Sequence, residues 1–263
     1  MPQVLPHYEV LPGRGPHLLL VHGMLSSRSQ WRPNLPALSR VCRPVVLELY
    51  GHGRSPAPDA VEAYHPDRYV DAFERIGDQI GAERWFVLGQ SLGAALTLRY
   101  ALAHPERVIA QLLTNTSSAF SPPEWGRDLE PAMRALQSAV SEQGAAAVER
   151  MPIHPRQARR LAPEIKAALV ADAAEHDPQG IAFSGRGTVV HAALGHRLRE
   201  NRVPALLACG THEKRFTPLR DRAARQMPLL EIEDMDGGHS VNLDAPAEFD
   251  RAAVRFIARH VRA

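Results

Sequence analysis

The pentapeptide Gly89-Gln90-Ser91-Leu92-Gly93 carries the strongest chemical signal in the sequence. It matches G-x-S-x-G, the pattern of a nucleophilic serine on a sharp turn between a strand and a helix. An apolar run precedes the pentapeptide and an Ala- and Leu-rich stretch follows it, as that turn requires. The two glycines allow backbone conformations that a Cβ atom would disfavour. We predict that Ser91 attacks an acyl carbonyl and that the Leu92 N–H is one of two oxyanion donors.

A serine hydroxyl is a weak nucleophile until a base accepts its proton. His239 is our candidate for this base, because it stands in the Gly-rich segment Asp236–Ser240 between the last predicted strand and the last predicted helix. In an open parallel sheet such a loop lies at the same edge as the turn that carries Ser91. Four other histidines remain as alternatives: His22, His52, His104 and His212.

A carboxylate should hold the imidazole in one tautomer and stabilise its charged form. When the chain order is serine, acid, histidine, the acid follows the strand predicted over Pro204–Gly210. Glu213 is the only carboxylate in that loop before Asp221. We therefore predict that Glu213 orients the base. Asp234 and Asp236 are weaker alternatives, because they precede the histidine too closely in the chain.

The loop after the first buried strand supplies further candidates. It reads His22-Gly23-Met24-Leu25, and we predict that the Met24 N–H is the second oxyanion donor. The turn Gly51–Ser55 follows the second central strand and is predicted to be structural. Contacts to the substrate are predicted at four positions: His22, Gln90, Trp31 and Arg156.

Strand and helix patterns alternate over the first half of the chain. Continuous apolar runs predict strands buried on both faces, at His17–His22, Pro44–Tyr50, Arg84–Gln90 and Val108–Thr114, and again later at Pro204–Gly210 and Leu229–Asp234. Apolar spacings of three and four predict helices, at Pro66–Ile80, Leu92–Ala103 and Pro246–His260, the last with Asp244 as its N-cap. This alternation predicts an α/β fold with a mostly parallel sheet.

The pattern changes after Ser117, where the chain becomes rich in helix-formers and prolines. We predict a helical cap over residues 119–202, inserted into an α/β core formed by residues 1–118 and 203–263. A separate domain is the alternative. Arginines are frequent in this cap and could bind a carboxylate or phosphate through paired hydrogen bonds, although a solvated helix surface explains them as well. Aromatic side chains could wall a pocket or pack in a core: Trp31, Phe120, Trp125 and Phe183.

The composition is that of an ordinary globular protein. The 263 residues include 31 basic and 29 acidic side chains, a net charge of +2 that gives no electrostatic reason to expect nucleic acid or membrane as a partner. The 13 histidines lack metal-ligand spacing, and Cys42 and Cys209 are expected to be buried thiols. We expect no metal, no cofactor, no signal peptide and no transmembrane helix, and hence a cytoplasmic protein. The oligomeric state is left open, with a homodimer as one candidate.

The chain resembles the α/β-hydrolase superfamily over nearly its whole length. The resemblance rests on an ordered series of segments: His22-Gly23-Met24, Gly51–Ser55, Gly89–Gly93, the loop after Gly210, and Gly237-Gly238-His239. It implies an α/β-hydrolase fold with helices on both faces of the sheet and a cap. The loop Gly210–Phe216 is similar to the acid loop of the synthase of the menaquinone pathway that forms a 2-succinyl-cyclohexadiene carboxylate. That family usually has Asp at the place of Glu213, and Arg at the place of Ala95.

The resemblance and the candidate triad together favour a serine hydrolase acting on a small-molecule ester, lactone or thioester. A synthase or lyase that uses the same triad for proton abstraction and elimination is the first alternative. A non-catalytic ligand-binding protein with a hydrolase-like fold is the second. The identity of the substrate does not follow from the sequence.

Overall fold

Seven strands form one sheet in the computed structural model, which describes residues 4–261. In chain order the strands are β1 Tyr8–Val10, β2 His17–Val21, β3 Arg43–Leu47, β4 Trp85–Gly89, β5 Val108–Thr114, β6 Ala205–Gly210 and β7 Leu230–Met235. Their spatial order is β1-β3-β2-β4-β5-β6-β7. Only β1 is antiparallel to its neighbour, and the other five pairings are parallel. The predicted α/β fold class is confirmed.

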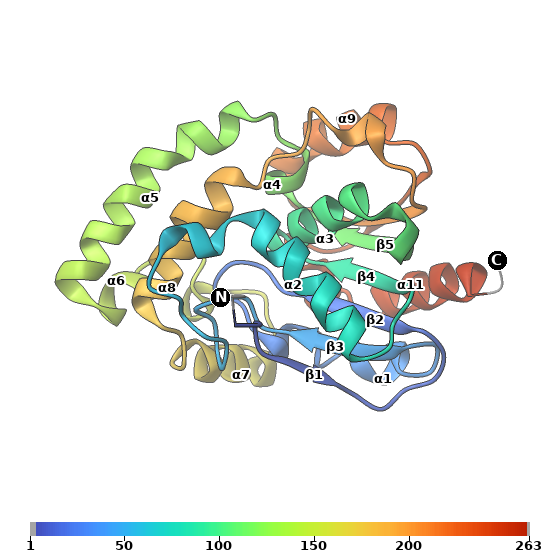
Figure 1. Cartoon of the computed structure of the whole chain (residues 1–263), viewed down its shortest axis with the longest axis horizontal. Coiled ribbons are helices and arrows are strands. Elements are labelled where there is room, and N and C mark those ends of the chain that lie inside the picture. The colour runs from blue at the N-terminus through green and yellow to red at the C-terminus, as the bar shows by residue number, and fades with distance from the viewer. Residues whose placement is uncertain (1–3, 262–263) are drawn as a thin grey trace.

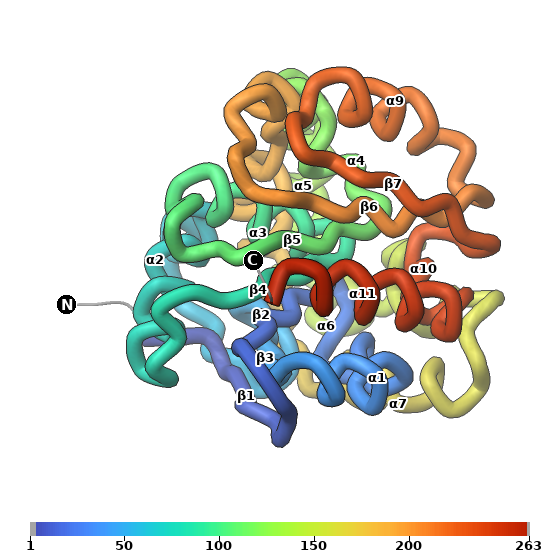
Figure 2. The backbone as a smooth tube through the Cα atoms, turned by 90° about the vertical axis from the view of Figure 1, so that its right-hand side faces the viewer, coloured from blue at the N-terminus to red at the C-terminus, as the bar shows by residue number. Residues whose placement is uncertain are grey.

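Helices cover both faces of this sheet and divide its core into two clusters. One cluster lies under α2 (Pro66–Gln79), α3 (Leu92–Ala103) and α9 (Thr217–Gln226). The other lies under α1 (Leu35–Leu38) and α11 (Pro246–His260). Figure 2 shows α2 and α3 on one side of the strands and α1 and α11 on the other. The central strands are therefore apolar on both faces, which is why they read as continuous apolar runs.

The chain from 115 to 204 contains helices and loops but no strand. Its helices are α4 Ser117–Phe120, α5 Glu124–Gln143, α6 Ala145–Glu149, α7 Pro163–Ala173 and α8 Pro178–Phe183. In Figure 1, α5, α6 and α8 lie to the left of the sheet, next to the edge where β4 passes into α3. We keep the name cap for residues 119–202. No helix within residues 4–261 is long and apolar enough to cross a membrane.

Two differences from the sequence prediction have physical reasons. Strand β1 was not predicted, because its three residues pair only at the sheet edge and are not buried. Asp244 is not the N-cap of α11: Ala245 occupies that position, and Asp244 ends the short helix α10 (Val241–Asp244). The Asp244 carboxylate instead accepts a hydrogen bond from the Gly238 N–H at 2.8 Å.

Candidate active site

Ser91 lies on a strained turn between β4 and α3. Its backbone has φ +53° and ψ −114°, a conformation that non-glycine residues rarely adopt. The flanking glycines are required by close packing. A Cβ atom on Gly89 would lie 2.4 Å from the Ala94 nitrogen, and one on Gly93 would lie 2.1 Å from the Val21 oxygen. The serine is thereby presented at the N-terminus of a helix, where negative charge is favoured.

Two hydroxyls after β5 stabilise this turn, and sequence reasoning missed both. Thr116 Oγ1 donates to the Ser91 carbonyl oxygen at 2.8 Å, and Ser118 Oγ donates to the same oxygen at 3.3 Å. Thr116 also caps α4, because its Oγ1 accepts from the Ala119 N–H. Both bonds hold the strained carbonyl in place. A run of polar residues directly after a buried strand was the available signal.

His239 and Glu213 form a hydrogen-bonded pair at the carboxyl ends of the last two strands. The distance from His239 Nδ1 to Glu213 Oε2 is 2.9 Å. Glu213 follows β6 and His239 follows β7, and these strands are parallel neighbours. A carboxylate bound at Nδ1 fixes the proton there and leaves Nε2 free to accept a proton. The His239 side chain is 44% exposed, so this nitrogen is accessible from the cavity described below.

Asn115 orients the carboxylate and was also missed by the sequence analysis. Its Nδ2 donates to Glu213 Oε2 at 2.8 Å and to the Gly210 carbonyl oxygen at 3.0 Å, while its Oδ1 accepts from the Gly210 N–H. Burial raises the pKa of Glu213, but hydrogen bonds from His239 and Asn115 and the charge of His239 outweigh it. The pKa of Glu213 therefore lies below its usual value, and the side chain is a carboxylate.

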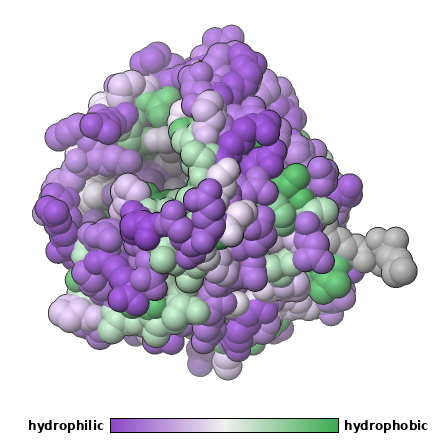
Figure 3. Space-filling model, turned by 90° about the vertical axis from the view of Figure 1, so that its left-hand side faces the viewer, coloured by the Kyte–Doolittle hydropathy of each residue, from purple (hydrophilic) through white to green (hydrophobic). Residues whose placement is uncertain are grey.

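Two chambers meet at the serine and the histidine. The larger has a volume of about 420 Å³ and the smaller about 150 Å³. Four residues line both chambers: Met24, Ser91, Ile153 and His239. The smaller chamber is mostly apolar, with walls from Trp125, Met133, Met151 and Val189. The face on which the cap lies is hollowed, and hydrophilic side chains surround most of the hollow (Figure 3).

Two backbone N–H groups at this junction have no hydrogen-bond partner among residues 4–261. They belong to Leu92, at the start of α3, and to Met24, in the loop after β2. Leu92 lines the smaller chamber and Met24 lines both. Unpaired N–H donors beside a nucleophile are what an oxyanion requires. The predicted donor pair and the predicted Ser91, His239 and Glu213 are thus brought to one sheet edge.

Comparison with known proteins identifies the family. Residues 16–246 match the family model of the alpha/beta hydrolase fold. The chain belongs to this family. It is 26% identical over 253 residues to the "Putative 2-succinyl-6-hydroxy-2,4-cyclohexadiene-1-carboxylate synthase" of Bacillus subtilis, covering 94% of this chain and 92% of that protein. It is 25% identical to the "Uncharacterized carboxylesterase nap" of the same organism, covering 93% and 80%. The solved structure of MenH from S. aureus shares the fold, with a TM-score of 0.84, 20% identity and coverage of 97% and 98%.

Of the four substrate contacts predicted for this α/β hydrolase, one lines a chamber and three do not. Gln90 lines the larger chamber. His22 and Trp31 do not, because both side chains are fully buried. Arg156 points to solvent, 3.6 Å from Glu149, and lines neither chamber. The cap contributes Arg159 and Arg160 to the larger chamber instead.

Other predicted alternatives are engaged elsewhere. His212 receives a hydrogen bond from the Arg160 guanidinium at 2.9 Å and lies 2.6 Å from Asp236. Asp234 pairs with Arg220 on the surface. A further cavity of about 980 Å³ lies between the cap and the start of α2 and does not include Ser91. Within residues 4–261 no group of three or more His, Cys, Asp or Glu side chains could hold a metal ion.

Proposed function

We propose that this α/β hydrolase cleaves a small carboxylic ester, lactone or thioester through an acyl-enzyme. The observation that carries the proposal is the junction of two chambers at Ser91 and His239, with Glu213 bonded behind the imidazole. One chamber can then hold the acyl group and the other the leaving group. This is the arrangement that acyl transfer by a serine needs.

The chemistry follows from the roles of the side chains. His239 Nε2 takes the proton from the Ser91 hydroxyl as the serine oxygen attacks the carbonyl carbon. The Met24 and Leu92 N–H groups hold the oxyanion of the tetrahedral intermediate. Collapse of this intermediate expels the alcohol or thiol, which receives the proton from the imidazole. Water then attacks the acyl-enzyme by the same steps and regenerates the serine, and Glu213 stabilises the imidazolium each time.

The chambers suggest which part of the substrate lies where. The smaller one is apolar and has room for a short acyl chain only. The larger one is lined by Arg159, Arg160 and Asp244, and the two arginines suit a polar or anionic leaving group. We therefore propose a small-molecule substrate with a short apolar acyl group and a more polar alcohol or thiol.

The test is turnover of p-nitrophenyl esters from acetate to decanoate, with a thioester and a lactone in parallel. Ser91→Ala is expected to lower kcat at least about a thousandfold, as in triads generally. Wild-type turnover should peak at short acyl chains. Ser141→Ala, on the exposed side of α5, is the matched control and should behave as the wild type. Unchanged ester turnover by Ser91→Ala would end the proposal.

A synthase or lyase reaction is the second candidate. The similarity over 94% of the chain to a relative named as a putative synthase favours it. In such a reaction the triad would abstract a proton without forming an acyl-enzyme. Labelling of Ser91 by a fluorophosphonate, with no turnover of any ester, thioester or lactone, would select this candidate. Ala95, four residues after the nucleophile, is buried and cannot bind a substrate carboxylate.

A further inference from the structure

The loop that carries the Met24 N–H is itself strained. Leu25, the next residue, has φ +58°, in the left-handed region that favours glycine. A backbone in this region persists only where surrounding contacts hold it. The direction of the Met24 N–H depends on this loop, so whatever holds Gly23–Leu25 also aims the oxyanion donor.

Two buried histidines make the contacts on either side of Met24. The Leu25 N–H donates to His52 Nε2 at 3.1 Å, and His22 Nδ1 lies 2.7 Å from the Gly23 carbonyl oxygen. Both rings are fully buried, and their centroids lie 5.2 Å apart. The two peptide groups that flank Met24 are thus bonded to side chains that never touch the cavity.

The second nitrogen of each ring is bonded to the neighbouring loop after β3. His22 Nε2 accepts from the Leu49 N–H at 3.1 Å, and His52 Nδ1 lies 3.0 Å from the Tyr50 carbonyl oxygen. These bonds require the proton on Nδ1 and a lone pair on Nε2 in both rings. Each ring therefore links the loop that carries the oxyanion donor to the end of the next strand.

The cap closes this assembly from outside. His176, just after α7, packs over His52 with a centroid distance of 5.0 Å, and its Nδ1 accepts from the Gly53 N–H at 2.9 Å. Asp172 of α7 accepts hydrogen bonds of 2.6 Å from Ser27 and from Ser29.

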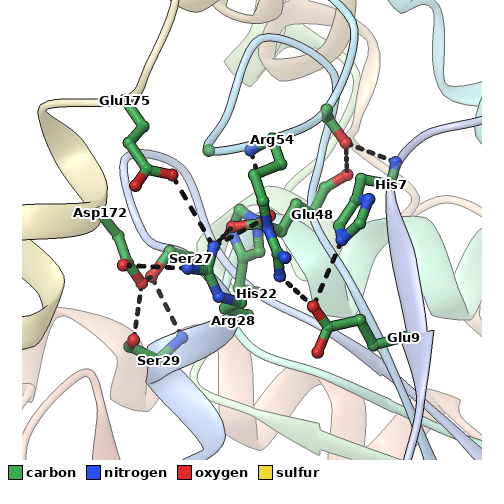
Figure 4. Close-up of polar contacts among 12 residues, drawn as sticks. His7, Glu9, His22, Ser27, Arg28, Ser29, Glu48, Arg54, Asp172 and Glu175 are labelled. Carbon is green, nitrogen blue, oxygen red and sulfur yellow. Dashed lines mark hydrogen bonds and ion pairs between the residues drawn. The ribbon is translucent and has the colours of Figure 1, made fainter.

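Charged groups complete the surroundings of the rings. Figure 4 shows Arg28 between Asp172 of the cap and Glu48 of the core, at 3.6 Å and 3.1 Å. Glu48 is fully buried and also accepts a hydrogen bond from the Arg54 N–H at 3.2 Å. The charged network lies around the histidines. The loop itself is bonded to the two rings, and the Gly23 carbonyl oxygen also accepts a hydrogen bond from the Ser26 N–H at 3.1 Å.

The histidines must be neutral for this role, because a protonated imidazole cannot accept from the Leu25 N–H. Burial lowers the pKa of both His22 and His52 to about 3. Both rings therefore stay neutral over the ordinary range of pH, and the loop is not disturbed when the catalytic base changes its protonation.

We propose that His22 and His52 are positioning residues, which hold the Gly23–Leu25 loop so that the Met24 N–H points at the oxyanion. This role rests on the proposed function. It gives the turn Gly51–Ser55 a part in the reaction, and it explains a histidine in the first loop that does not contact substrate.

The experiment compares His52→Leu, which has no acceptor, with His52→Gln, whose amide oxygen can accept from Leu25 N–H. With a short p-nitrophenyl ester, His52→Leu is expected to lower kcat by about 10- to 100-fold, somewhat less than loss of an oxyanion donor itself. KM should change less than threefold. The inhibition constant of a trifluoromethyl ketone, which mimics the tetrahedral intermediate, should rise by the same factor as kcat falls. His52→Gln should recover most of both losses.

Asn201→Ala is the control for general destabilisation. Asn201 is buried and hydrogen-bonded near the amino end of β6, the opposite end from the site. If His52→Leu matches this control in kcat and in ketone affinity, or if His52→Gln is no better than His52→Leu, the positioning role is wrong. Wild-type ester turnover and Ser91→Ala test the proposed function separately, so the two failures can be told apart.

Discussion

The histidine on the cavity wall and the histidines beneath it have opposite environments. The His239 side chain is 44% exposed and bonded to a carboxylate, whereas His22 and His52 are fully buried and bonded to backbone groups. A carboxylate neighbour and access to water favour an imidazole that can gain a charge. A buried ring among neutral backbone groups must stay neutral.

The difference teaches that the burial and the hydrogen-bond partners of a histidine, and not its residue type alone, determine what it can do. All of these histidines lie after strands at one edge of the sheet, and sequence reasoning treated His22, His52 and His239 as rivals for one role. In the structure they have two kinds of surroundings, for which we propose two roles. One histidine is proposed to move a proton, and two to hold a backbone donor that must not move.

The largest effect should come from removing the charge behind the exposed histidine. In Glu213→Gln the amide can no longer stabilise an imidazolium, and its NH₂ group can face Nδ1 and favour the wrong tautomer. We expect kcat for a short ester to fall about a thousandfold, which corresponds to about 4 kcal/mol. Steady-state kinetics together with thermal unfolding measure this.

Asn115→Ala provides the comparison, because it removes a hydrogen bond to the same carboxylate and keeps the charge. A loss of about tenfold or less is expected there, the size of one hydrogen bond of typical strength. A Glu213→Gln variant with nearly full activity would show that the carboxylate only supports the loop.

The sequence was sufficient for the architecture because the buried strands are continuous apolar runs. Strand β5 and helices α3 and α11 lie where the pattern predicts them, and the other predicted strands differ by a few residues at their ends. Strand β1 was not predictable, because three partly exposed residues have no periodicity to detect. The N-cap of α11 was misjudged, because a carboxylate near a helix start can also bond another loop.

The site was predictable where a local motif exists and not where contacts join distant segments. Ser91 and Leu92 follow from one pentapeptide, and His239 and Glu213 follow from chain order. Asn115 could not be assigned, because its partners are nearly a hundred residues away. The substrate contact predicted in the cap, Arg156, lines neither chamber, whereas Arg159 and Arg160 line the larger one. The sequence of the cap does not reveal which arginine lies at the cavity.

His176, which packs over the buried ring of His52, should make the stability of the protein depend on pH. Burial, the nearby His52 and His154 lower the pKa of His176 to about 3, from an ordinary value of 6.5. Below pH 6.5 the unfolded chain binds a proton that the folded chain does not bind until about pH 3. The contribution of His176 to the free energy of unfolding is therefore fully present above pH 6.5 and declines as the pH falls toward 3.

For one such histidine the decline between pH 7 and pH 5 amounts to about 2 kcal/mol. Urea unfolding at the two pH values should thus show a pH effect smaller by about 2 kcal/mol in His176→Gln than in the wild type. An identical pH effect in both proteins would mean that the pKa of His176 is not lowered in the folded state.

The smallest effect on kcat is expected at Asp172, a buried carboxylate that, like Glu213, accepts two hydrogen bonds. The Asp172 side chain is 7% exposed. Burial raises the pKa of Asp172, but bonds from Ser27 and Ser29 and nearby arginines outweigh it and hold the pKa below its usual value. Its donors are hydroxyls and not the imidazole that we propose as the base, so we expect its charge to hold the cap to the core.

Asp172→Asn should therefore lower the free energy of unfolding by about 1–2 kcal/mol, the size of a lost charged hydrogen bond, and lower kcat less than about threefold. Glu213→Gln should do the reverse, with a large kinetic loss and little change in stability. Chemical unfolding and ester kinetics on the two variants decide this together. If Asp172→Asn lost activity as steeply as Glu213→Gln, the buried carboxylate would have to act on the reacting atoms through the loop, and the division between the two sides would not hold.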